Sequence, residues 1–389
     1  MPEFSEKISE DNKVQELKEK LQNDIATLRD PEHGYIKAGY PRFMRLFGRD
    51  SLIVSNQLME TDPNICRSTL KILSEFQGKK FDAVSEEEPG KIVHETDPGK
   101  NHHPEYEWIP FPYYGSVDST PWFLITFAKY LEKTDDQEFL NQHKENIEAA
   151  AQWLETKTKS DPSGFLRYQR KQEKGQLFHQ GWKDSFSDSL GIEPPVAIVE
   201  AQGYSYLALK EAAKLLNNKK YNQLADEFKK RFNEKFWMED EKYFALALDG
   251  ENQQKKTITS NPGHLLFTGI LEKDKEDLVV KRLFEPDMWT TYGLRTHSLN
   301  ETNFDAKSYH LGSVWPHDNW IIAQGLKKLR YNNEYQKIKE AILKAQKEFG
   351  YIPELYAVTP EGKLEEIEKA CKLQAWASGA AIQFLTQTK

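Results

Sequence analysis

The chain has 389 residues, a length that suits two average domains or one large architecture. Its formal net charge of -8, with no dense basic patch, argues against a nucleic-acid partner or an anionic membrane surface. No apolar run approaches the length of a membrane span, and the polar N-terminal segment has no hydrophobic stretch typical of a signal peptide.

Helical periodicity extends over most of the chain. Apolar residues recur at three- and four-residue steps over 5–28, which predicts an amphipathic helix. One short strand is expected at 242–248, and strand signals are otherwise sparse. Further helices are predicted near 51–59, 64–76, from about 121 to 131, and at 136–158, 198–217, 219–236, 262–271, 273–284, 316–328, 332–349 and 372–387.

Roughly twelve helices without a Gly-Ser or Pro-rich linker predict one all-α domain over residues 1–389. The count favours an (α/α)6 barrel, a toroid of six helical hairpins, over two separate bundles. In such a ring, loops at one end of the inner helices line a central cavity. The long loop 77–112 is rich in charged residues, Gly and Pro and has little periodicity. We expect it to lie near the active site and to move as a lid.

Five loops at or just before the starts of predicted helices combine aromatic side chains with carboxylates. They are 47–50, 112–120, 180–185, 309–319 and 352–356. Loops at the same end of successive hairpins would converge on one pocket. A pocket of aromatic rings and charged groups suits a ligand with many hydroxyls, such as a sugar. The simpler role of helix N-cap also fits some of these residues, notably Asp118 and Asp318.

The candidate general acid for glycoside hydrolysis is Asp184. It follows Trp182, whose ring would desolvate the carboxyl and raise its pKa, whereas the Lys183 cation would lower that pKa. Asp188, about one turn away, is the alternative acid.

Hydrolysis also requires a second carboxyl group on the opposite side of the anomeric carbon. Glu354 is the candidate because it stands in an otherwise apolar run that follows Pro353. Glu200 competes with it, although a Glu that opens a helix can simply favour the helix dipole.

Other chemistries have weaker sequence support. The chain has no Gly-rich phosphate loop, no His-Glu-x-x-His and no Gly-x-Ser-x-Gly elbow. The adjacent pair His102-His103 lacks the spacing of zinc ligands, so we expect neither a metal nor a cofactor. His94, His264 and His317 leave open a polysaccharide lyase or sugar epimerase on the same toroid, and a non-catalytic sugar-binding protein is a further alternative.

Five motifs follow one another between about residue 43 and residue 380. They are Phe-Gly-Arg-Asp-Ser at 47–51, Tyr-Tyr-Gly-Ser-Val-Asp at 113–118, Gln-Gly-Trp-Lys-Asp-Ser at 180–185, Gly-Ser-Val-Trp-Pro-His-Asp-Asn at 312–319 and Gln-Ala-Trp-Ala-Ser-Gly at 374–379. Together they resemble the motifs of amylo-α-1,6-glucosidase-like (glycogen-debranching-type) glycoside hydrolases. That family is related to glucoamylases, processing α-glucosidase I and the mannosylglycerate/glucosylglycerate hydrolases.

The resemblance implies an (α/α)6 barrel and an inverting, exo-acting hydrolase of an α-linked residue, with glucose the first expectation. It would make Asp184 the general acid and Glu354 the general base that activates water. Further side chains are expected to bind the sugar; these are Arg49, Asp50, Tyr114, Asp118, Trp182, Lys183, Gln202, His264, Arg295, Tyr309, Trp315, His317, Asp318 and Gln374.

Within the same superfamily, an α-mannosyl- or α-glucosyl-glycerate hydrolase would place Lys183, Arg49 or Arg295 against an acidic aglycone. The N-terminal β-rich domain of many relatives is missing, so an oligosaccharide or small glycoside is expected rather than glycogen. The cysteines Cys66 and Cys371 are far apart and fit a reduced, cytoplasmic protein. The expected partner is a small carbohydrate, with no nucleic acid, no membrane and no indicated oligomeric state.

Overall fold

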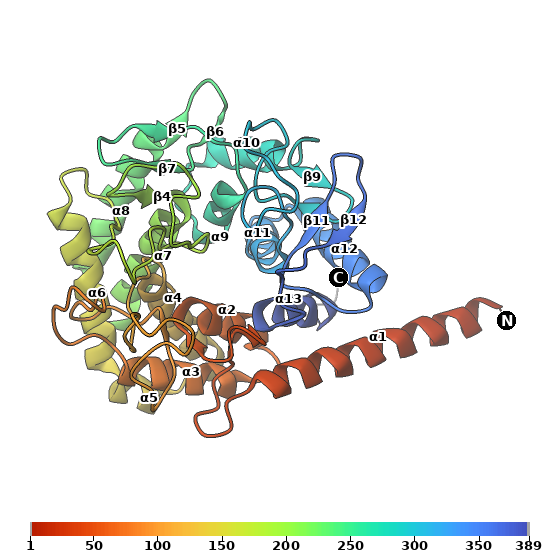
Figure 1. Ribbon diagram of the computed structural model, residues 1–389, viewed down its shortest axis with the longest axis horizontal. Coiled ribbons are helices and arrows are strands. Elements are labelled where there is room, and N and C mark those ends of the chain that lie inside the picture. The colour runs from red at the N-terminus through yellow and green to blue at the C-terminus, as the bar shows by residue number, and fades with distance from the viewer. Residues whose placement is uncertain (1, 387–389) are drawn as a thin grey trace.

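Helices dominate the structure (Figure 1). The computed structural model describes residues 2–386, with side chains described from Val14 onward. This part of the chain contains 13 α-helices, one 3-10 helix and 13 strands of only two or three residues. The expectation of a mainly helical fold is therefore confirmed. None of the helices in residues 2–386 is long and apolar enough to cross a bilayer.

Six helical segments contact one another in a closed succession. Each packs on the next, and the last packs on the first. Every residue of the first of these segments, α2 (Gly48–Leu58), is buried, as expected for a helix covered on all sides. In order, the six are α2 (Gly48–Leu58), α4 (Ser119–Thr134), α7 (Val199–Leu215), the pair η1 (Asn261–His264) and α9 (Leu265–Thr268), α11 (Pro316–Lys328) and α13 (Ala375–Thr386).

A second set of six helices packs on this succession, and each contacts one or two of its members. Several of them bury one face and expose the other, which explains their amphipathic sequences. The six are α1 (Pro2–Leu28), α3 (Pro63–Glu75), α6 (Lys144–Ser160), α8 (Lys219–Lys235), α10 (Lys273–Leu283) and α12 (Asn332–Phe349).

The predicted helices at 198–217, 219–236, 273–284, 316–328 and 332–349 end within two residues of the observed α7, α8, α10, α11 and α12. Two of the other predicted helices are interrupted. The stretch 136–158 is broken at His143 into α5 (Gln137–Gln142) and α6, and 262–271 is a 3-10 turn followed by a short helix. That helix ends at Gly269, whose φ of 80° permits the left-handed cap.

The expected strand at 242–248 is interrupted. It forms two short strands, β6 (Tyr243–Phe244) and β7 (Ala247–Leu248), with different partners. Strand β6 pairs with β5 (Trp237–Met238), whereas β7 lies between β4 (Ala197–Ile198) and β8 (Gln254–Lys255).

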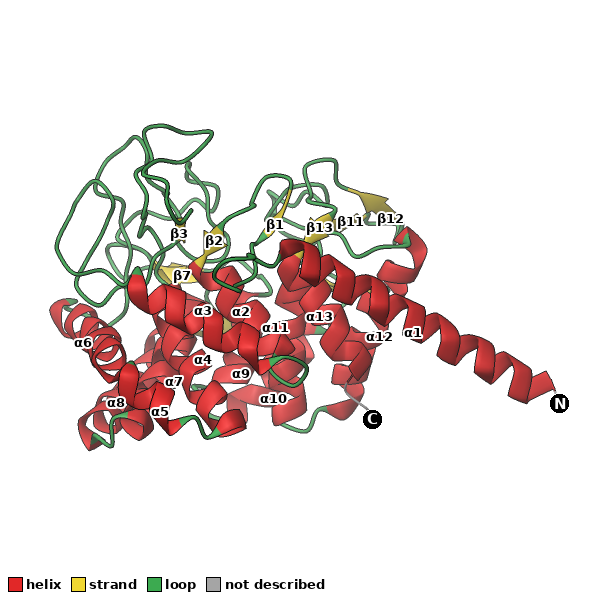
Figure 2. Ribbon diagram, turned by 90° about the horizontal axis from the view of Figure 1, so that it is seen from below, coloured by secondary structure: helices red, strands yellow, loops and turns green. Residues whose placement is uncertain are grey.

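Long loops gather on one face of the helical body, together with several of the short strands (Figure 2). The strand pairs tie loops that are distant in the sequence. They are β1 (Gly39–Tyr40) with β13 (Leu373–Gln374), β2 (Leu46–Phe47) with β3 (Glu95–Thr96), β9 (Trp289–Thr290) with β10 (Gly293–Leu294), and β11 (Tyr356–Val358) with β12 (Leu364–Glu366). Two of these pairs, β1–β13 and β2–β3, fix the chain immediately around the starts of α13 and α2.

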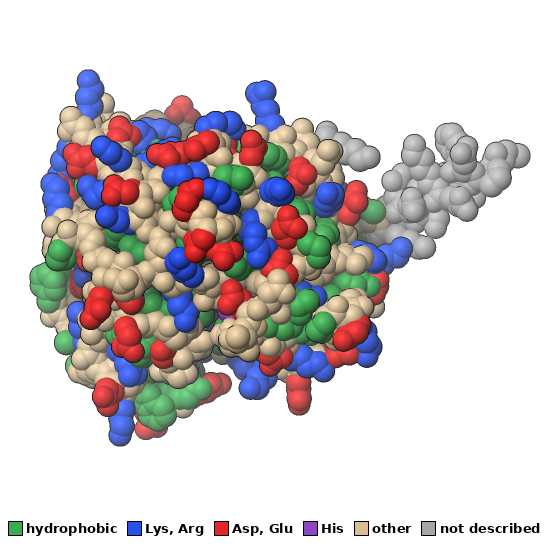
Figure 3. Space-filling view, turned by 90° about the horizontal axis from the view of Figure 1, so that it is seen from above, with side chains coloured by type: hydrophobic (Ala, Val, Ile, Leu, Met, Phe, Trp, Pro, Cys, Tyr) green, Lys and Arg blue, Asp and Glu red, His purple; other side chains and the backbone are tan. Residues whose placement is uncertain are grey.

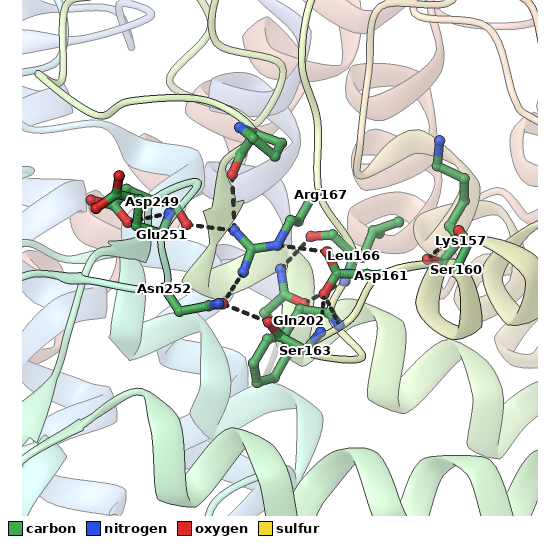
Figure 4. Close-up of polar contacts among 12 residues, drawn as sticks. Lys157, Ser160, Asp161, Ser163, Leu166, Arg167, Gln202, Asp249, Glu251 and Asn252 are labelled. Atoms are coloured by element: carbon green, nitrogen blue, oxygen red, sulfur yellow. Dashed lines mark hydrogen bonds and ion pairs between the residues drawn. The ribbon is translucent and has the colours of Figure 1, made fainter.

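Arg167 anchors the long loop that joins α6 to α7 (Figure 4). Its Nη1 donates to the main-chain oxygens of Pro195 at 2.9 Å and Asp249 at 2.7 Å, and its Nε lies 2.8 Å from Asp161 Oδ2. The beginning of the loop that carries 180–185 is therefore fixed to the neighbouring segments. On the face drawn in Figure 3, basic and acidic side chains intermingle, and neither sign forms a continuous patch.

Candidate active site

A small pocket opens among the clustered loops. Its lining comes from segments that the sequence separates widely: 38–50, 182–184, 309–315, 354 and 374–376. The lining residues are Ala38, Phe43, Phe47, Asp50, Trp182, Asp184, Tyr309, His310, Trp315, Glu354, Gln374 and Trp376. The structure thus brings both candidate catalytic carboxyls into one pocket, with five of the expected sugar-binding residues.

A larger cavity of about 350 Å³ lies elsewhere on the loop face, between the loop 81–91 and the segment 153–171. It is lined by none of the expected catalytic or sugar-binding residues. We take the smaller pocket as the candidate active site because it combines three carboxyls with convergent aromatic rings, as a sugar site requires.

Asp184 is held in the pocket by Arg49, the second residue of α2. Both guanidinium Nη atoms donate to Asp184 Oδ2, at 3.0 and 2.9 Å. Burial raises the pKa of Asp184 to about 7. The Arg49 cation lowers this pKa, and the nearby Asp118 carboxylate raises it further. The side chain keeps 33% of its surface exposed, so a ligand in the pocket can reach the carboxyl.

Arg49 also ties this loop to the rest of the site. It is almost fully buried, and it donates to the main-chain oxygen of Gly181 at 3.1 Å and to Asp118 Oδ2 at 3.3 Å. Asp118 occupies the position before α4 that was expected for an N-cap, but its side chain makes no capping hydrogen bond. It accepts instead from Arg49 and from Ser116 Oγ, at 2.8 Å.

Glu354 faces the same pocket from a different loop. Its Oε2 accepts from the Cys371 N–H at 2.8 Å, and its Oε1 accepts from the Tyr309 hydroxyl. Burial raises the pKa of Glu354, although the hydrogen bonds from Cys371 and Tyr309 lower it. Arg42, whose side chain is 40% exposed, places its Nη2 3.7 Å from Oε2. Glu354 is thus a buried, fixed carboxyl with a defined orientation.

Asp50 is the third carboxyl of the pocket. It lies in the first turn of α2, directly after Arg49, and is buried. Burial raises its pKa to about 7, opposed by Arg49 and assisted by Asp184 and Glu354. Three carboxyls that share one small pocket cannot all ionise easily, so at least one of them holds a proton near neutral pH.

Aromatic rings form the walls of the pocket. Trp315 is central: it packs edge-on against Trp182 at 5.6 Å and Tyr309 at 4.8 Å between ring centroids, and stacks on His310 at 5.5 Å. Trp315 Nε1 donates to the main-chain oxygen of Tyr309 at 2.8 Å. These contacts fix the rings before any ligand binds.

Four of the expected sugar-binding residues lie behind the pocket wall. Lys183 Nζ donates to the Thr296 main-chain oxygen at 2.7 Å, and burial lowers its pKa to about 8. His264 Nε2 and Asp318 Oδ1 are 2.7 Å apart in a fully buried pair. Asp318 lies in the first turn of α11 and does not occupy its N-cap. His317 stacks on the pocket residue Trp376, with ring centroids 3.7 Å apart.

Three others are buried elsewhere and hold the main chain. The Tyr114 hydroxyl donates to the Phe76 oxygen at 2.8 Å. The Gln202 amide bridges the main-chain N–H and oxygen of Leu166, at 3.0 and 2.8 Å (Figure 4). Arg295 donates to the main-chain oxygens of Val358 and Thr359. None of the three lines the pocket.

The two alternative carboxyls are also outside the pocket lining. Asp188 accepts from the N–H groups of Gly191 at 2.7 Å and Ile192 at 3.2 Å, and its Oδ1 lies 2.9 Å from His179 Nε2. It therefore stabilises its own loop. Glu200 is fully buried beneath Gly181, where a Cβ would come within 3.2 Å of its Oε1.

The pocket contains residues that sequence reasoning did not assign. His310 and Trp376 lie within segments already noted, next to Tyr309 and two residues after Gln374. Phe43 reaches the pocket on the loop 38–50, which is fastened by the β1–β13 pair. Two-residue strands leave no periodic signal, so the sequence alone gave no sign of that contribution.

The long loop 77–112 is attached to the site through β3. Glu95 Oε2 accepts from Arg45 Nε at 2.7 Å, and Arg45 also contacts His103. Whether a ligand moves this loop stays a prediction.

In the part of the chain whose side chains are described, no group of three or more His, Cys, Asp or Glu residues could hold a metal ion.

A family model described as the mannosylglycerate hydrolase MGH1-like glycoside hydrolase domain matches residues 90–359. No curated protein matches the sequence. Among solved structures, the chain resembles a GH63 mannosylglycerate hydrolase from Thermus thermophilus. The complex of that enzyme with Tris and D-glycerate gives a TM-score of 0.73 at 14% identity, covering 95% of this chain and 100% of the other. Its complex with glucose gives 0.72 at 15% identity with the same coverage. An uncharacterized conserved protein from the same organism gives 0.72 at 15% identity, again covering 95% and 100%. These likenesses show a common fold.

Proposed function

Because the chain belongs to the family of mannosylglycerate hydrolase MGH1-like glycoside hydrolase domains, we propose that it is an inverting, exo-acting enzyme that removes an α-linked glucosyl residue from an oligosaccharide or small glycoside. The protein is a glycosidase, and the lyase, epimerase and binding-protein alternatives give way to that assignment. One observation carries the finer proposal: Asp184 and Glu354, from separate loops, line the same pocket.

The architecture proposed for this enzyme is a single (α/α)6 barrel over residues 1–389. Its support is the closed succession of six buried helical segments, each backed by a helix of the second set. The loops gathered on one face would then be the loops at one end of the barrel. This is the position where a toroid presents its active site.

Asp184 is proposed as the general acid. Its raised pKa keeps a substantial fraction protonated at neutral pH, as a proton donor requires. Arg49 occupies Oδ2, so Oδ1 would give its proton to the glycosidic oxygen as the bond from that oxygen to the anomeric carbon breaks.

Glu354 is proposed as the general base. The Cys371 N–H and the Tyr309 hydroxyl fix the orientation of its two oxygens. In its ionised form it would take a proton from a water molecule, whose oxygen forms the new bond to the opposite face of the anomeric carbon. The configuration at that carbon is thereby inverted.

The terminal sugar would contact Asp50, Trp182, Tyr309, Trp315 and Gln374, which all line the pocket. The remaining expected residues would not contact the sugar and would act through their neighbours. Arg49, Asp118, Lys183, His264, His317 and Asp318 support the pocket wall, and Tyr114, Gln202 and Arg295 hold main-chain segments.

Hydrolysis of an α-mannosyl- or α-glucosyl-glycerate is the second candidate function. The family description and the solved relative with bound D-glycerate favour it. Of the cations first considered for an acidic aglycone, Arg49 is engaged by carboxylates, and Lys183 and Arg295 are engaged by main-chain oxygens. Arg42 also donates to a main-chain oxygen, that of Lys369, but its side chain is 40% exposed beside Glu354, so it is the cation better placed for that role.

The test is hydrolysis of α-linked di- and trisaccharides, α-glucosylglycerate and α-mannosylglycerate, with the released anomer followed by NMR. We expect the β-anomer to appear first. Asp184→Asn and Glu354→Gln should each lower kcat by about a thousandfold, the usual scale for general acid–base catalysis. Asp188→Asn is the matched control for the neighbouring carboxylate and should retain most activity. Retention of the anomeric configuration, or activity in either pocket variant, would overturn the two-carboxylate mechanism.

We further propose that the loop 77–112 closes over bound substrate and that the enzyme works on its small carbohydrate in the cytoplasm, with neither nucleic acid nor membrane as partner. The attachment of the loop to the site through β2 and β3 supports its involvement. The two free, buried cysteines, Cys66 and Cys371, support a reducing compartment. Slower hydrogen exchange across 77–112 on sugar binding is expected, and unchanged exchange would contradict closure.

A further inference from the structure

Three exposed aromatic side chains form a cluster outside the pocket. Tyr106, Trp108 and Phe186 keep 36%, 62% and 46% of their surface exposed. Their rings are in contact: Tyr106 lies 5.4 Å from Trp108 and 5.8 Å from Phe186 between centroids. We call these three residues the aromatic platform. Clustered exposed rings are more informative than scattered ones, because contiguous apolar surface usually marks a binding site.

His103 supports the platform from beneath, at Tyr106. The buried ring of His103 packs 4.8 Å from Tyr106, and its Nδ1 accepts from the N–H groups of Glu105 and Tyr106, both at 3.0 Å. The main-chain N–H of His103 donates to the main-chain oxygen of Ile109 at 3.0 Å, and this bond closes the turn that carries Trp108. The turn 103–109 is therefore internally fixed, so the rings of Tyr106 and Trp108 would move together if the loop 77–112 closes.

Phe186 is fixed by the loop that carries the proposed acid. The preceding residue, Ser185, pairs through its main chain with His179, and its Oγ donates to the Ser187 oxygen at 2.6 Å. Phe186 follows Asp184 by two residues, so the two α-carbons are at most roughly 7 Å apart. The platform therefore begins next to the pocket.

A second connection runs through Arg45. Its guanidinium lies 5.1 Å over the ring of Phe47, a pocket residue, and also contacts His103 beneath the platform. Arg45 thus links the pocket wall to the residue that supports the platform.

The position beside Asp184 determines which part of a substrate the platform would meet. A general acid protonates the oxygen of the leaving group, so the surface that continues outward from the acid faces the aglycone. This step rests on the proposed function. The terminal sugar would fill the enclosed pocket, and the aglycone would extend over the platform.

We propose that Tyr106, Trp108 and Phe186 form an aglycone subsite that stacks on further sugar rings, so that the substrate is an α-linked oligosaccharide. Aromatic faces suit the apolar C–H faces of sugar rings. The platform contributes no cation, and the exposed acidic residues Glu105 and Glu107 flank its rings. A small anionic aglycone such as glycerate would meet like charge here and would cover little of the aromatic surface.

The experiment compares substrates with and without a ring in the leaving group. Rates are measured on α-glucosyl and α-mannosyl fluorides, whose leaving group is fluoride, and on α-linked di- and trisaccharides and glycosylglycerates. Trp108→Ala and Phe186→Ala should each lower kcat/KM for the trisaccharide about tenfold more than for the fluoride, since one aromatic stacking contact is worth about that factor. Phe81→Ala removes an 81% exposed ring from the same loop, 77–112, but outside the platform. It is the matched control for effects on loop closure and should change both rates by the same factor.

Equal losses on fluoride and trisaccharide, or much faster wild-type cleavage of a glycosylglycerate than of any oligosaccharide, would overturn the subsite while leaving the glycosidase assignment intact. Failure of the wild type on every substrate would instead contradict the proposed α-glycosidase specificity. Calorimetric binding of a free disaccharide then decides on the subsite separately: weaker binding by Trp108→Ala than by Phe81→Ala supports it, and equal binding refutes it.

Discussion

Arg49 places both of its Nη atoms on a single oxygen of Asp184, Oδ2, at 3.0 and 2.9 Å. No hydrogen bond from the described residues reaches the other oxygen, Oδ1. The arginine therefore fixes the orientation of the carboxyl and leaves one oxygen for the proton. Burial raises the pKa of Asp184 and Arg49 opposes the rise, so the value near 7 is a balance of the two.

Arg49→Met should destabilise the protein strongly. It removes the buried cation that pairs with Asp118 and Asp184 and leaves the fully buried Asp118 without its ion-pair partner. A loss of about 3 kcal/mol in the free energy of unfolding is expected for a broken buried pair, measured by urea denaturation. Arg29→Met is the matched control: its pair with Asp62 is exposed, and the loss should stay under about 1 kcal/mol.

The pH dependence of kcat/KM should fall on both sides of a maximum. Asp184, the proposed acid, must be protonated to act, so activity should decline as the pH rises through about 7, its pKa. Glu354, the proposed base, must be ionised, so activity should also decline at low pH as it takes up a proton. Rates on an uncharged disaccharide over pH 4–9 measure both limbs. An alkaline limb that persists unchanged in Asp184→Glu, with its longer side chain, would indicate a different acid.

Asp50→Asn should gain stability relative to wild type as the pH rises from 5 to 8. The folded-state pKa of Asp50 is raised to about 7 by burial. A carboxyl with a raised pKa binds a proton more tightly when folded, so its contribution to stability is full below the ordinary pKa near 4 and is lost as the pH rises through 7. The amide has no such dependence. Melting temperatures of both proteins at pH 5 and pH 8 test this, and a constant difference between them would contradict it.

Tyr309→Phe should shift the acid limb of the pH profile upward. The Tyr309 hydroxyl donates to Glu354 Oε1, and a hydrogen bond to an ionised carboxylate lowers its pKa. Without that donor, Glu354 is protonated at higher pH, and kcat at neutral pH should fall about tenfold. Tyr351→Phe removes an equivalent hydroxyl that donates to Glu366 on the surface, at 2.8 Å, and should leave the profile as it was. A displaced limb in both variants would argue against a specific role of Tyr309.

Much of the fold could be predicted from helical periodicity. It works well for α8 and α12, which bury one face and expose the other. It fails at 136–158, where the break at His143 leaves no interruption in the apolar pattern, and at the two-residue strands, which are too short for any period.

The meeting of Asp184 and Glu354 with Trp182, Tyr309 and Trp315 in one pocket could be predicted because their loops share one end of the helices. The direction in which a side chain points within a motif could not be predicted. Tyr114, in the motif 113–118, points away from the pocket and donates to the Phe76 oxygen, and Gln202 binds the main chain of Leu166. A buried polar side chain must find a partner, and when that partner is the main chain of a distant segment, sequence spacing carries no sign of it.

The pairing of β1 with β13, and the packing of α13 on α2, have a consequence for biosynthesis. Gln374 and Trp376 complete the wall of a pocket whose first residues lie near position 40. The ribosome synthesises these two parts of the wall at the beginning and at the end of translation. The helices made early therefore cannot complete the closed succession until α13 has been synthesised. A nascent chain should therefore acquire helical structure long before it acquires activity, and a ribosome stalled ahead of residue 374 should carry an inactive product.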